Sequence, residues 1–203
     1  MDEILLIGAG GHAGACIDVI ETSDRFRVAG LVEKSGAKSR DYMGYPIIGF
    51  EDELPRLRHS FKYALVAFGH IRSAINREKI FESLMKLEFA LPVIVSPRAY
   101  VSSHAKVDVG TIVMHGAIIN ANASIGKNCI VNSTALVEHD VVVNDHCHVS
   151  TGAIINGQAT IGKGSFIGSG ATLIESVSLG ERCVIGANML IKHDLQSNSV
   201  FKV

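Results

Sequence analysis

The sequence predicts a small α/β domain followed by a parallel β-helix, and two observations carry this prediction. The first ninety or so residues read as a buried strand, a glycine turn and a helix, followed by further strand and helix segments in the order βαβ…βα. From residue 95 onward, an aliphatic residue recurs at every sixth position. A short fixed period is typical of solenoid folds, so the two parts of the chain should have different architectures.

The amino-terminal part begins with a short apolar run, the glycine turn GAGGHAG and an apolar helix. Further strands are expected over residues 27–34 and 62–69, and a helix over residues 76–87. This order predicts a small parallel sheet. Prolines at positions 92 and 97 punctuate the segment that follows, so we place one domain at residues 1–92 and the other at residues 93–203.

The glycine turn carries a partial dinucleotide fingerprint. Gly8, Gly10 and Ala13 match the GxGxxA pattern, and Glu33 lies 20 residues beyond Ala13. Glycines would let the backbone approach a pyrophosphate at the helix N-terminus, or they could simply pack the helix on the strand. About 90 residues are too few for a double-wound NAD domain, so a half-Rossmann-like domain for a nucleotide diphosphate is expected. His12 could donate to such a ligand or could be solvated.

The six-residue period dominates the second part of the chain. Seventeen consecutive positions are Val, Ile or Leu: 95, 101, 107, 113, 119, 125, 131, 137, 143, 149, 155, 161, 167, 173, 179, 185 and 191. Three residues after them Gly or Asn is common, which suits a turn with unusual backbone angles, and four residues after them small side chains prevail. The pattern predicts a triangular coil of about 18 residues, repeated about five times, with the aliphatic column inside.

Three of the four cysteines fall in the small-residue column of this repeat. Cys129, Cys147 and Cys183 are separated by multiples of 18 residues, so they should stack along one edge of the β-helix. No cysteine forms a CxxC pair, and we therefore expect core packing and no metal or redox role.

The stretch LVEHDVVVNDHCHVS, residues 136–150, concentrates three histidines. The period keeps His139 and His148 out of the aliphatic column, so both can point away from the core. A solvated position for His139 and a corner hydrogen bond for His148 remain alternatives, and His146 is expected to be exposed. Together with His115 these imidazoles could also hold zinc, but Asp140 directly after His139 suits a histidine base better.

Composition excludes several classes of function. The chain has 203 residues, 47% of them hydrophobic and 19% charged, with a net charge of −1. A basic excess, which nucleic acid or an anionic membrane would favour, is missing. The beginning resembles neither a signal peptide nor a bilayer span, and we expect a cytoplasmic protein.

The glycine-turn segment IGAGGHAG and the repeat segment NSTALVEHD…HCHVSTGAIING together resemble one family. It is the hexapeptide-repeat acetyltransferases of the sialic-acid O-acetyltransferase and UDP-amino-sugar N-acetyltransferase group, and the resemblance covers nearly the whole chain. It implies a left-handed β-helix, a homotrimer, and acetyl-CoA bound in the groove between neighbouring β-helices as a co-substrate. It implies no metal.

The resemblance also implies roles for residues of the β-helix. The family's catalytic histidine and the acid after it match His139 and Asp140, where Asp replaces the often-seen Glu. A supporting asparagine matches Asn132, and a second histidine beside the cofactor matches His148. The remaining expected cofactor contacts are Gly157, whose backbone would face the thioester, and Ser169 and Ala187 along the pantetheine arm.

In the small domain, the resemblance implies binding of the nucleotide of a sugar acceptor. Gly11 and His12 match the phosphate loop, together with Gly8 and Gly10 of the fingerprint. Glu33 matches an acidic position, Lys34 stands where some relatives have a second acid, and Gly69 precedes further contacts in a segment longer here than in relatives.

The expected function is N-acetylation of a UDP-linked 4-amino-4,6-dideoxy sugar, in bacterial surface-glycan or nonulosonate biosynthesis. A histidine base would remove the proton from the amine as its nitrogen attacks the thioester of acetyl-CoA. The alternatives are O-acetylation of a sialic-acid-like sugar, and a non-catalytic scaffold that binds sugar nucleotides. Activity on a panel of acceptors distinguishes them.

Overall fold

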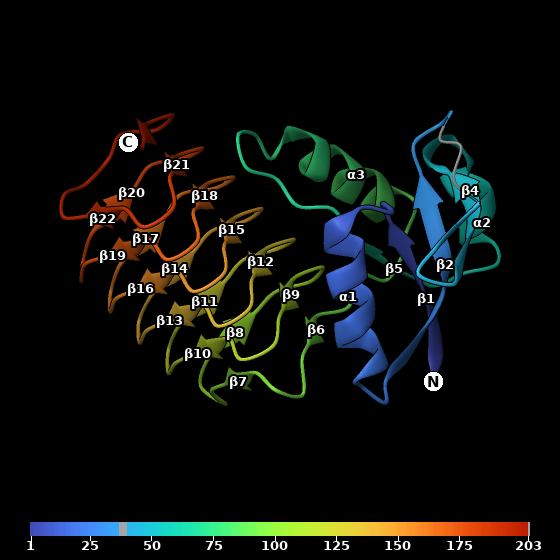
Figure 1. The fold of residues 1–203 in the computed structure, drawn as a ribbon, viewed down its shortest axis with the longest axis horizontal. Helices are drawn as coiled ribbons and strands as arrows, with labels where there is room; N and C mark the ends of the chain where they lie inside the picture. The colour runs from blue at the N-terminus through green and yellow to red at the C-terminus, as the bar shows by residue number, and fades with distance from the viewer. Residues whose placement is uncertain (37–39, 203) are drawn as a thin grey trace.

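The computed structural model describes residues 1–36 and 40–202, which form an α/β domain packed against one side of a parallel β-helix (Figure 1). This is the predicted pair of architectures. Among the described residues, no helix is long and apolar enough to cross a bilayer.

The α/β domain is built on a five-stranded sheet of order β3-β4-β2-β1-β5, in which all neighbours except β3 and β4 are parallel. Its strands are β1 (Asp2–Ile7), β2 (Phe26–Glu33), β3 (Asp41–Tyr42), β4 (Tyr45–Phe50) and β5 (Tyr63–Val66). Its helices are α1 (Gly11–Glu21), η1 (Glu51–Glu53), α2 (Leu54–Arg58) and α3 (Ile75–Lys86).

The hairpin of β3 and β4 was not anticipated from the sequence. The two-residue turn Met43–Gly44 has φ angles of 53° and 82°, the left-handed values that a tight hairpin needs. The Met-Gly pair between two tyrosines was the available signal. β4 then pairs in parallel with β2, so the hairpin extends the sheet beyond the strand that carries Glu33.

The β-helix has three sides, each a stack of two-residue parallel strands in which residue i pairs with residue i+18, except that β21 pairs with β23 at a separation of 16 residues. The junction side holds β6 (Ile94–Val95), β9 (Ile112–Val113), β12 (Ile130–Val131), β15 (His148–Val149), β18 (Phe166–Ile167), β21 (Val184–Ile185) and β23 (Val200–Phe201). The second side holds β7 (Tyr100–Val101), β10 (Ile118–Ile119), β13 (Leu136–Val137), β16 (Ile154–Ile155), β19 (Thr172–Leu173) and β22 (Leu190–Ile191). The third side holds β8 (Lys106–Val107), β11 (Ser124–Ile125), β14 (Val142–Val143), β17 (Thr160–Ile161) and β20 (Ser178–Leu179).

The aliphatic column fills the interior, as predicted, from Val113 to Ile191. The first three positions differ: Val101 and Val107 are only partly buried, and Val95 is 37% exposed. These residues belong to the first coil, which has no coil beneath it. The three cysteines of the repeat are buried free thiols, which confirms their place in the core.

The turn column is also confirmed. Fourteen residues at six-residue intervals, from Gly110 to Asn188, have φ between 54° and 70°. They form three corners. The helix corner holds Gly110, Asn128, His146, Gly164 and Arg182; the open corner holds Gly116, Thr134, Gly152, Gly170 and Asn188; and the distal corner holds Asn122, Asp140, Gln158 and Ser176. Because the distal corner joins the second and third sides, it lies opposite the junction side.

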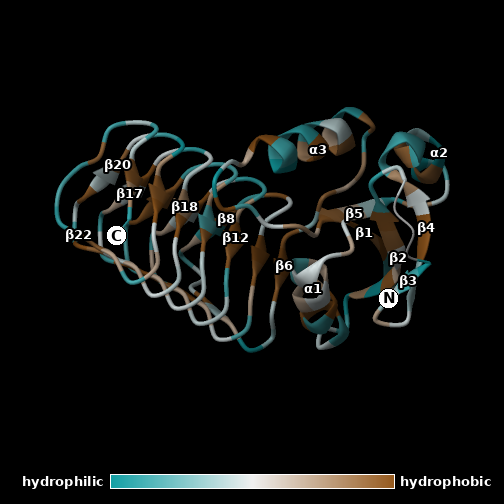
Figure 2. Cartoon of the chain, turned by 45° about the horizontal axis from the view of Figure 1, so that its top comes forward, coloured by the Kyte–Doolittle hydropathy of each residue, from teal (hydrophilic) through white to brown (hydrophobic). Residues whose placement is uncertain are grey.

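The α/β domain contacts the β-helix through two helices. On the junction side, Ile112 and Ile130 pack in one buried cluster with Ala13 and Ile17 of α1. Figure 2 shows α1 beside β6, the first strand of this side. At the helix corner, the ring of Phe81 from α3 lies where a side chain at Gly110 would otherwise stand. The last contact of the α/β sheet is made by Ala90, bridged to Tyr63, and β6 of the β-helix begins four residues later.

A buried arginine joins the two parts. The guanidinium of Arg77 in α3 has no exposed surface and donates to the carbonyl oxygens of Val66 (2.8 Å), Phe68 (2.7 Å) and Asn128 (3.2 Å). Burial lowers the pKa of Arg77 to about 10, which leaves it protonated at neutral pH. These bonds fix the loop after β5 against the helix corner.

Two neighbouring valines test whether the aliphatic column points into the β-helix while the adjacent residues point outward. Val143 is 1% exposed and its neighbour Val142 is 39% exposed. Val143→Ala should lower the free energy of unfolding by about 2 kcal/mol, because it removes buried methyl groups and leaves a cavity. Val142→Ala, the matched control, should change it by less than about 0.5 kcal/mol. Urea unfolding measures both; equal losses would contradict the pattern.

Candidate functional site

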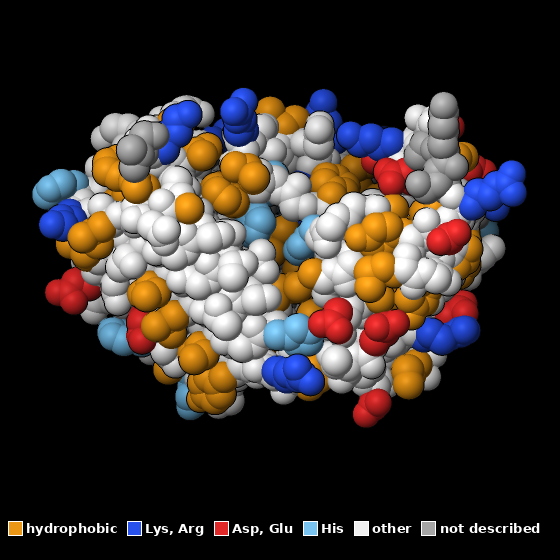
Figure 3. All heavy atoms as spheres, viewed as in Figure 1, with side chains coloured by type: hydrophobic (Ala, Val, Ile, Leu, Met, Phe, Trp, Pro, Cys, Tyr) orange, Lys and Arg blue, Asp and Glu red, His pale blue; other side chains and the backbone are white. Residues whose placement is uncertain are grey.

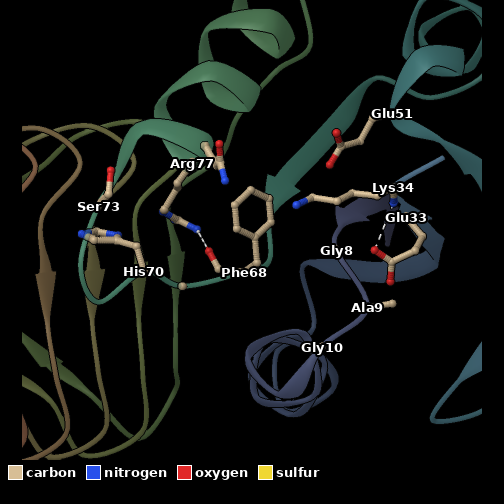
Figure 4. A pocket seen from close by; sticks show the side chains of 12 residues that line it. Gly8, Ala9, Gly10, Glu33, Lys34, Glu51, Phe68, His70, Ser73 and Arg77 are labelled. Atoms are coloured by element: carbon tan, nitrogen blue, oxygen red, sulfur yellow. Dashed lines mark hydrogen bonds between the residues drawn. The ribbon is translucent and has the colours of Figure 1, made fainter. Parts of the chain in front are cut away.

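A cavity of about 440 Å³ lies at the carboxyl ends of β1, β2 and β5 (Figure 4). This edge of a parallel sheet is where such folds place their ligands. Five of the seven residues expected to bind the acceptor line the cavity: Gly8, Gly10, Glu33, Lys34 and Gly69.

Glycine suits positions 8 and 10 for different physical reasons. Gly8 has φ 112°, and a side chain there would meet the ring of Phe68 at 3.1 Å. Gly10 precedes α1 and has no side-chain cap, and no atom of residues 1–36 and 40–202 lies within 4 Å of where its side chain would start. The backbone at Gly10 therefore faces open space in front of the helix N-terminus, where backbone N–H groups can receive an anion.

Gly11 and His12 do not line this cavity. Gly11 is exposed, and His12 lies in the first turn of α1 with its ring toward His148, the two centroids being 6.3 Å apart. Burial, followed by the charges of Arg77 and His148, lowers the pKa of His12 to about 3, and its Nε2 is buried without a partner. His12 is therefore a neutral donor or acceptor, and the solvated alternative is wrong.

Sequence reasoning missed much of the cavity wall. Phe68, His70, Ser73, Asn76 and Arg77, from the loop after β5 and the start of α3, line it together with Glu51. Their position directly after a parallel strand was the available signal. The carboxylates of Glu33 and Glu51, the ammonium group of Lys34 and the ring of Phe68 thus line one cavity.

A second cavity, of about 510 Å³, surrounds His139 at the distal corner. His139 donates from Nδ1 to Oδ2 of Asp140 at 2.8 Å, a bond that assigns the ring tautomer and leaves Nε2 as an open acceptor. The left-handed backbone of Asp140, with φ 59°, is well tolerated by Asp, and its other oxygen accepts from Asn122 at 3.2 Å. The shorter acid thus reaches the histidine.

The charges around His139 favour its protonated form. The hydrogen bond that His139 donates to Asp140 is the main cause that raises the pKa of His139, and the carboxylate of Glu138 adds to it. In turn, the hydrogen bond from His139, followed by that from Asn122, lowers the pKa of Asp140.

Gly157 lies directly beneath the imidazole of His139. A side chain at Gly157 would come within 2.8 Å of both Cε1 and Nε2 of that ring. A larger residue here would therefore displace the His139 ring from its present position, whereas the backbone itself would accept it, since φ at this residue is not left-handed. Asn156 and Glu175 complete the walls of the same cavity.

His148 points away from the β-helix core, as expected, but it is covered by the α/β domain. Its Nδ1 donates to the carbonyl oxygen of His70 at 2.9 Å, and its ring meets Phe166 edge-on at 5.2 Å. Burial lowers its pKa to about 4, so the ring is neutral. Asn132 lies beside His148, with 3.4 Å between Nδ2 and Nε2, and the described contacts of its side chain do not include His139.

The expectation that His146 is exposed was wrong. His146 is 5% exposed, accepts at Nδ1 from Asn128 at 2.9 Å and lies edge-on against Phe81 at 5.5 Å. The helix corner that carries it is covered by α3, which the repeat alone could not reveal.

Among the described residues, no three His, Cys, Asp or Glu side chains are placed to hold a metal ion, so their geometry does not support the zinc alternative. His115 makes other contacts: Nδ1 lies 2.6 Å from Oγ of Ser96, and Nε2 lies 2.7 Å from Oδ2 of Asp18 in α1.

Ser169 and Ala187 line a third cavity, of about 600 Å³, on the junction side beyond His148. The expected site residues therefore fall into separate places within one chain. The residues that line the first and third cavities lie at the junction side and open corner. His139, Asp140 and Gly157 lie at the opposite, distal corner.

Comparison with known proteins matches two separate segments of the chain to family descriptions. Residues 3–84 match the family described as PglD N-terminal domain, and residues 158–192 match the hexapeptide repeat of succinyl-transferase. A perosamine N-acetyltransferase variant from Caulobacter crescentus, in complex with CoA and GDP-perosamine, is 28% identical with a TM-score of 0.92 over 98% of this chain and 93% of its own.

Two further solved structures are similar. The acetyltransferase domain of PglB from Neisseria gonorrhoeae, in complex with acetyl coenzyme A, is 29% identical with a TM-score of 0.90, covering 98% of this chain and 94% of that one. WeeI from Acinetobacter baumannii, at 18% identity and a TM-score of 0.82 over 98% and 96%, shares the fold. With its PglD-type N-terminal domain and its left-handed β-helix, the chain is a hexapeptide-repeat acetyltransferase.

Proposed function

We propose that the chain transfers the acetyl group of acetyl-CoA to the 4-amine of a nucleotide-linked 4-amino-4,6-dideoxy sugar. The observation that carries the proposal is the His139–Asp140 pair, bonded at 2.8 Å above Gly157, in a chain with a separate cavity at its glycine turn. The similar structures with GDP-perosamine and with acetyl coenzyme A support this class of acceptor and donor. The sequence led us to expect a UDP-linked acceptor, whereas the similar structure contains GDP-perosamine. The acceptors to be tested therefore include both UDP-linked and GDP-linked sugars.

In this proposal His139 is the general base. Its open Nε2 takes a proton from the amine as the amine nitrogen bonds to the thioester carbon. Asp140 orients the ring and stabilises the imidazolium that forms. The tetrahedral intermediate collapses with cleavage of the carbon–sulfur bond, and the CoA thiolate takes up a proton. No residue of the chain is acylated.

The remaining roles follow the same scheme. The backbone N–H at Gly157 would stabilise the oxyanion, and Ser169 and Ala187 would border the pantetheine arm. His148, held neutral by burial, and Asn132 beside it would face the acetyl group as hydrogen-bonding partners. In the domain that we place at residues 1–92, the acceptor's nucleotide would bind the Gly8–His12 loop, Glu33, Lys34 and Gly69, and residues 93–203 would carry the chemistry.

We further propose that the working enzyme is a homotrimer with active sites shared between copies. His139 lies at the corner opposite the nucleotide pocket of its own chain, so a base and an acceptor can meet only across an interface. The second side, next to His139, carries a stripe of outward-facing Tyr100, Ile118, Leu136, Ile154 and Leu190 at multiples of 18 residues, of which Tyr100, Ile118 and Leu190 are more than a third exposed. Such a stripe suits burial against a second copy. We place the reaction in the cytoplasm.

The acceptor panel with His139→Ala is the main test. With acetyl-CoA and UDP- and GDP-linked 4-amino sugars plus free sialic acid, thiol release should occur with one or more of the 4-amino sugars. His139→Ala should reduce kcat by roughly 10²- to 10⁴-fold. The exposed His59→Ala is the control and should retain activity.

Three other outcomes would contradict this scheme. Turnover of sialic acid alone would favour the O-acetyltransferase alternative, and an inactive parent chain would favour the scaffold. A fully active His139→Ala enzyme would remove His139 from the base role.

The pH dependence of Asp140→Asn tests the pair. A base with a raised pKa is active only above that pKa, so kcat/KM of the parent should rise with pH through a pKa above about 6.5. Asp140→Asn removes the carboxylate, so this limb should move to lower pH, with a reduced plateau. The acceptor amine titrates identically in both enzymes, so a limb that stays in place would show that Asp140 does not act on the base.

Complementation tests the shared site. Gly10→Leu should fill the nucleotide pocket without disturbing the packing, since no atom of the described residues lies within 4 Å of its Cβ position. Trimers assembled randomly from equal amounts of Gly10→Leu and His139→Ala chains should recover about one quarter of parent activity, since each site draws on two copies. Each variant alone is the control. No recovery would mean that pocket and base act within one chain.

A further inference from the structure

The third cavity is an apolar cleft between the two domains. Ile71, from the loop after β5, faces Phe166, Val184 and Val200, the outward-facing residues of β18, β21 and β23. Ile71 and Val200 are 62% and 60% exposed, which is unusual for large aliphatic side chains so close together. In Figure 3, hydrophobic and basic side chains lie together along the upper edge, in the region of β21.

One loop separates this cleft from the nucleotide pocket. Phe68, His70 and Ser73 line the nucleotide pocket, whereas Ile71 and Arg72, between them in sequence, line the cleft. The loop is held from beneath: Arg77 binds the carbonyl of Phe68, and His148 binds the carbonyl of His70. Its anchored backbone therefore directs neighbouring side chains into two different cavities.

The charged side chains of the described residues that line the cleft all have the same sign. They are Arg72 and Lys202, and no carboxylate side chain of residues 1–36 and 40–202 lines it. Within the described residues neither forms an ion pair with a side chain. Lys202, on the residue after β23, packs over Gly186, where an added side chain would meet its Cβ at 3.0 Å. An apolar cleft with two unpaired cations suits a ligand that joins an apolar arm to phosphates.

We propose that Arg72 and Lys202 bind the phosphates of the acyl donor, coenzyme A, while Ile71, Phe166 and Val184 contact its pantetheine arm. This inference rests on the proposed function, and it is supported by Ser169 and Ala187, which line the same cleft. The guanidinium of Arg72 can take two phosphate oxygens at once, and Lys202 adds a mobile point charge. A residue of the nucleotide domain thereby takes part in donor binding.

Direct binding of CoA alone to the full chain, measured by calorimetry, tests the assignment. Arg72→Ala and Lys202→Ala should each raise Kd by roughly ten-fold, the loss of one charge-assisted contact. Arg72→Lys should recover part of the affinity. Lys79→Ala, an exposed cation on α3, is the matched control and should leave Kd unchanged. Added salt should weaken binding to the parent more than to the double variant, because screening acts on the two cations.

A donor without phosphates separates binding from a structural role. With S-acetylpantetheine, the Arg72→Ala/Lys202→Ala enzyme should equal the parent in kcat/KM, whereas with acetyl-CoA it should be slower. Equal CoA affinity in parent and double variant, or equal losses with both donors, would overturn the assignment. Absence of CoA binding by the parent would overturn it together with the proposed function. CoA binding without transfer to any acceptor would overturn only the proposed function, since the assignment is measured by binding.

Discussion

The left-handed backbone conformation at every sixth residue is the constraint on which the rest of the structure depends. It turns the chain at each corner, so that residue i pairs with residue i+18 and every column of the sequence becomes a row on the surface. Asp140 occupies one of these corner positions, and His139 precedes it. The side chains around the proposed base are therefore set by the same repeat that builds the core. Gly157, one coil further on, lies under the histidine for this reason.

Burial separates four of the histidines, those near the proposed site and the domain junction, into two kinds. His139 stands at an exposed corner beside a carboxylate, which raises its pKa, whereas His12, His70 and His148 meet at the domain junction, where burial lowers theirs to about 3 or 4. A proton acceptor that must charge during turnover benefits from the first environment. Neutral hydrogen-bonding groups next to the charge of Arg77 benefit from the second.

The sequence was sufficient where the physics is local and periodic. The aliphatic column, the turn column and the cysteine row could all be predicted because each coil needs the same types of residue at the same positions. Contacts between the two domains could not be predicted from the sequence. His146 has the same repeat position as Asp140, yet it is buried because α3 covers its corner. The loop after β5 and the first turn of α3 shape two cavities through contacts with residues far away in sequence, such as Asn128 and His148. Asn132, seven residues before His139, is carried by the coil to the junction side.

Because similar coils stack along one axis, the position of a corner along the β-helix changes only in fixed steps. Each coil advances the corners by one strand spacing, about 4.8 Å, and returns them to the same angular position. Inserting or deleting a whole coil of 18 residues between the junction and β13 would move the His139 corner along the axis by one such step, without turning it. Any shorter insertion would rotate it to another side. The depth at which a donor and an acceptor meet can therefore change in this architecture only by whole coils, so acceptors of intermediate length must be accommodated by the loops.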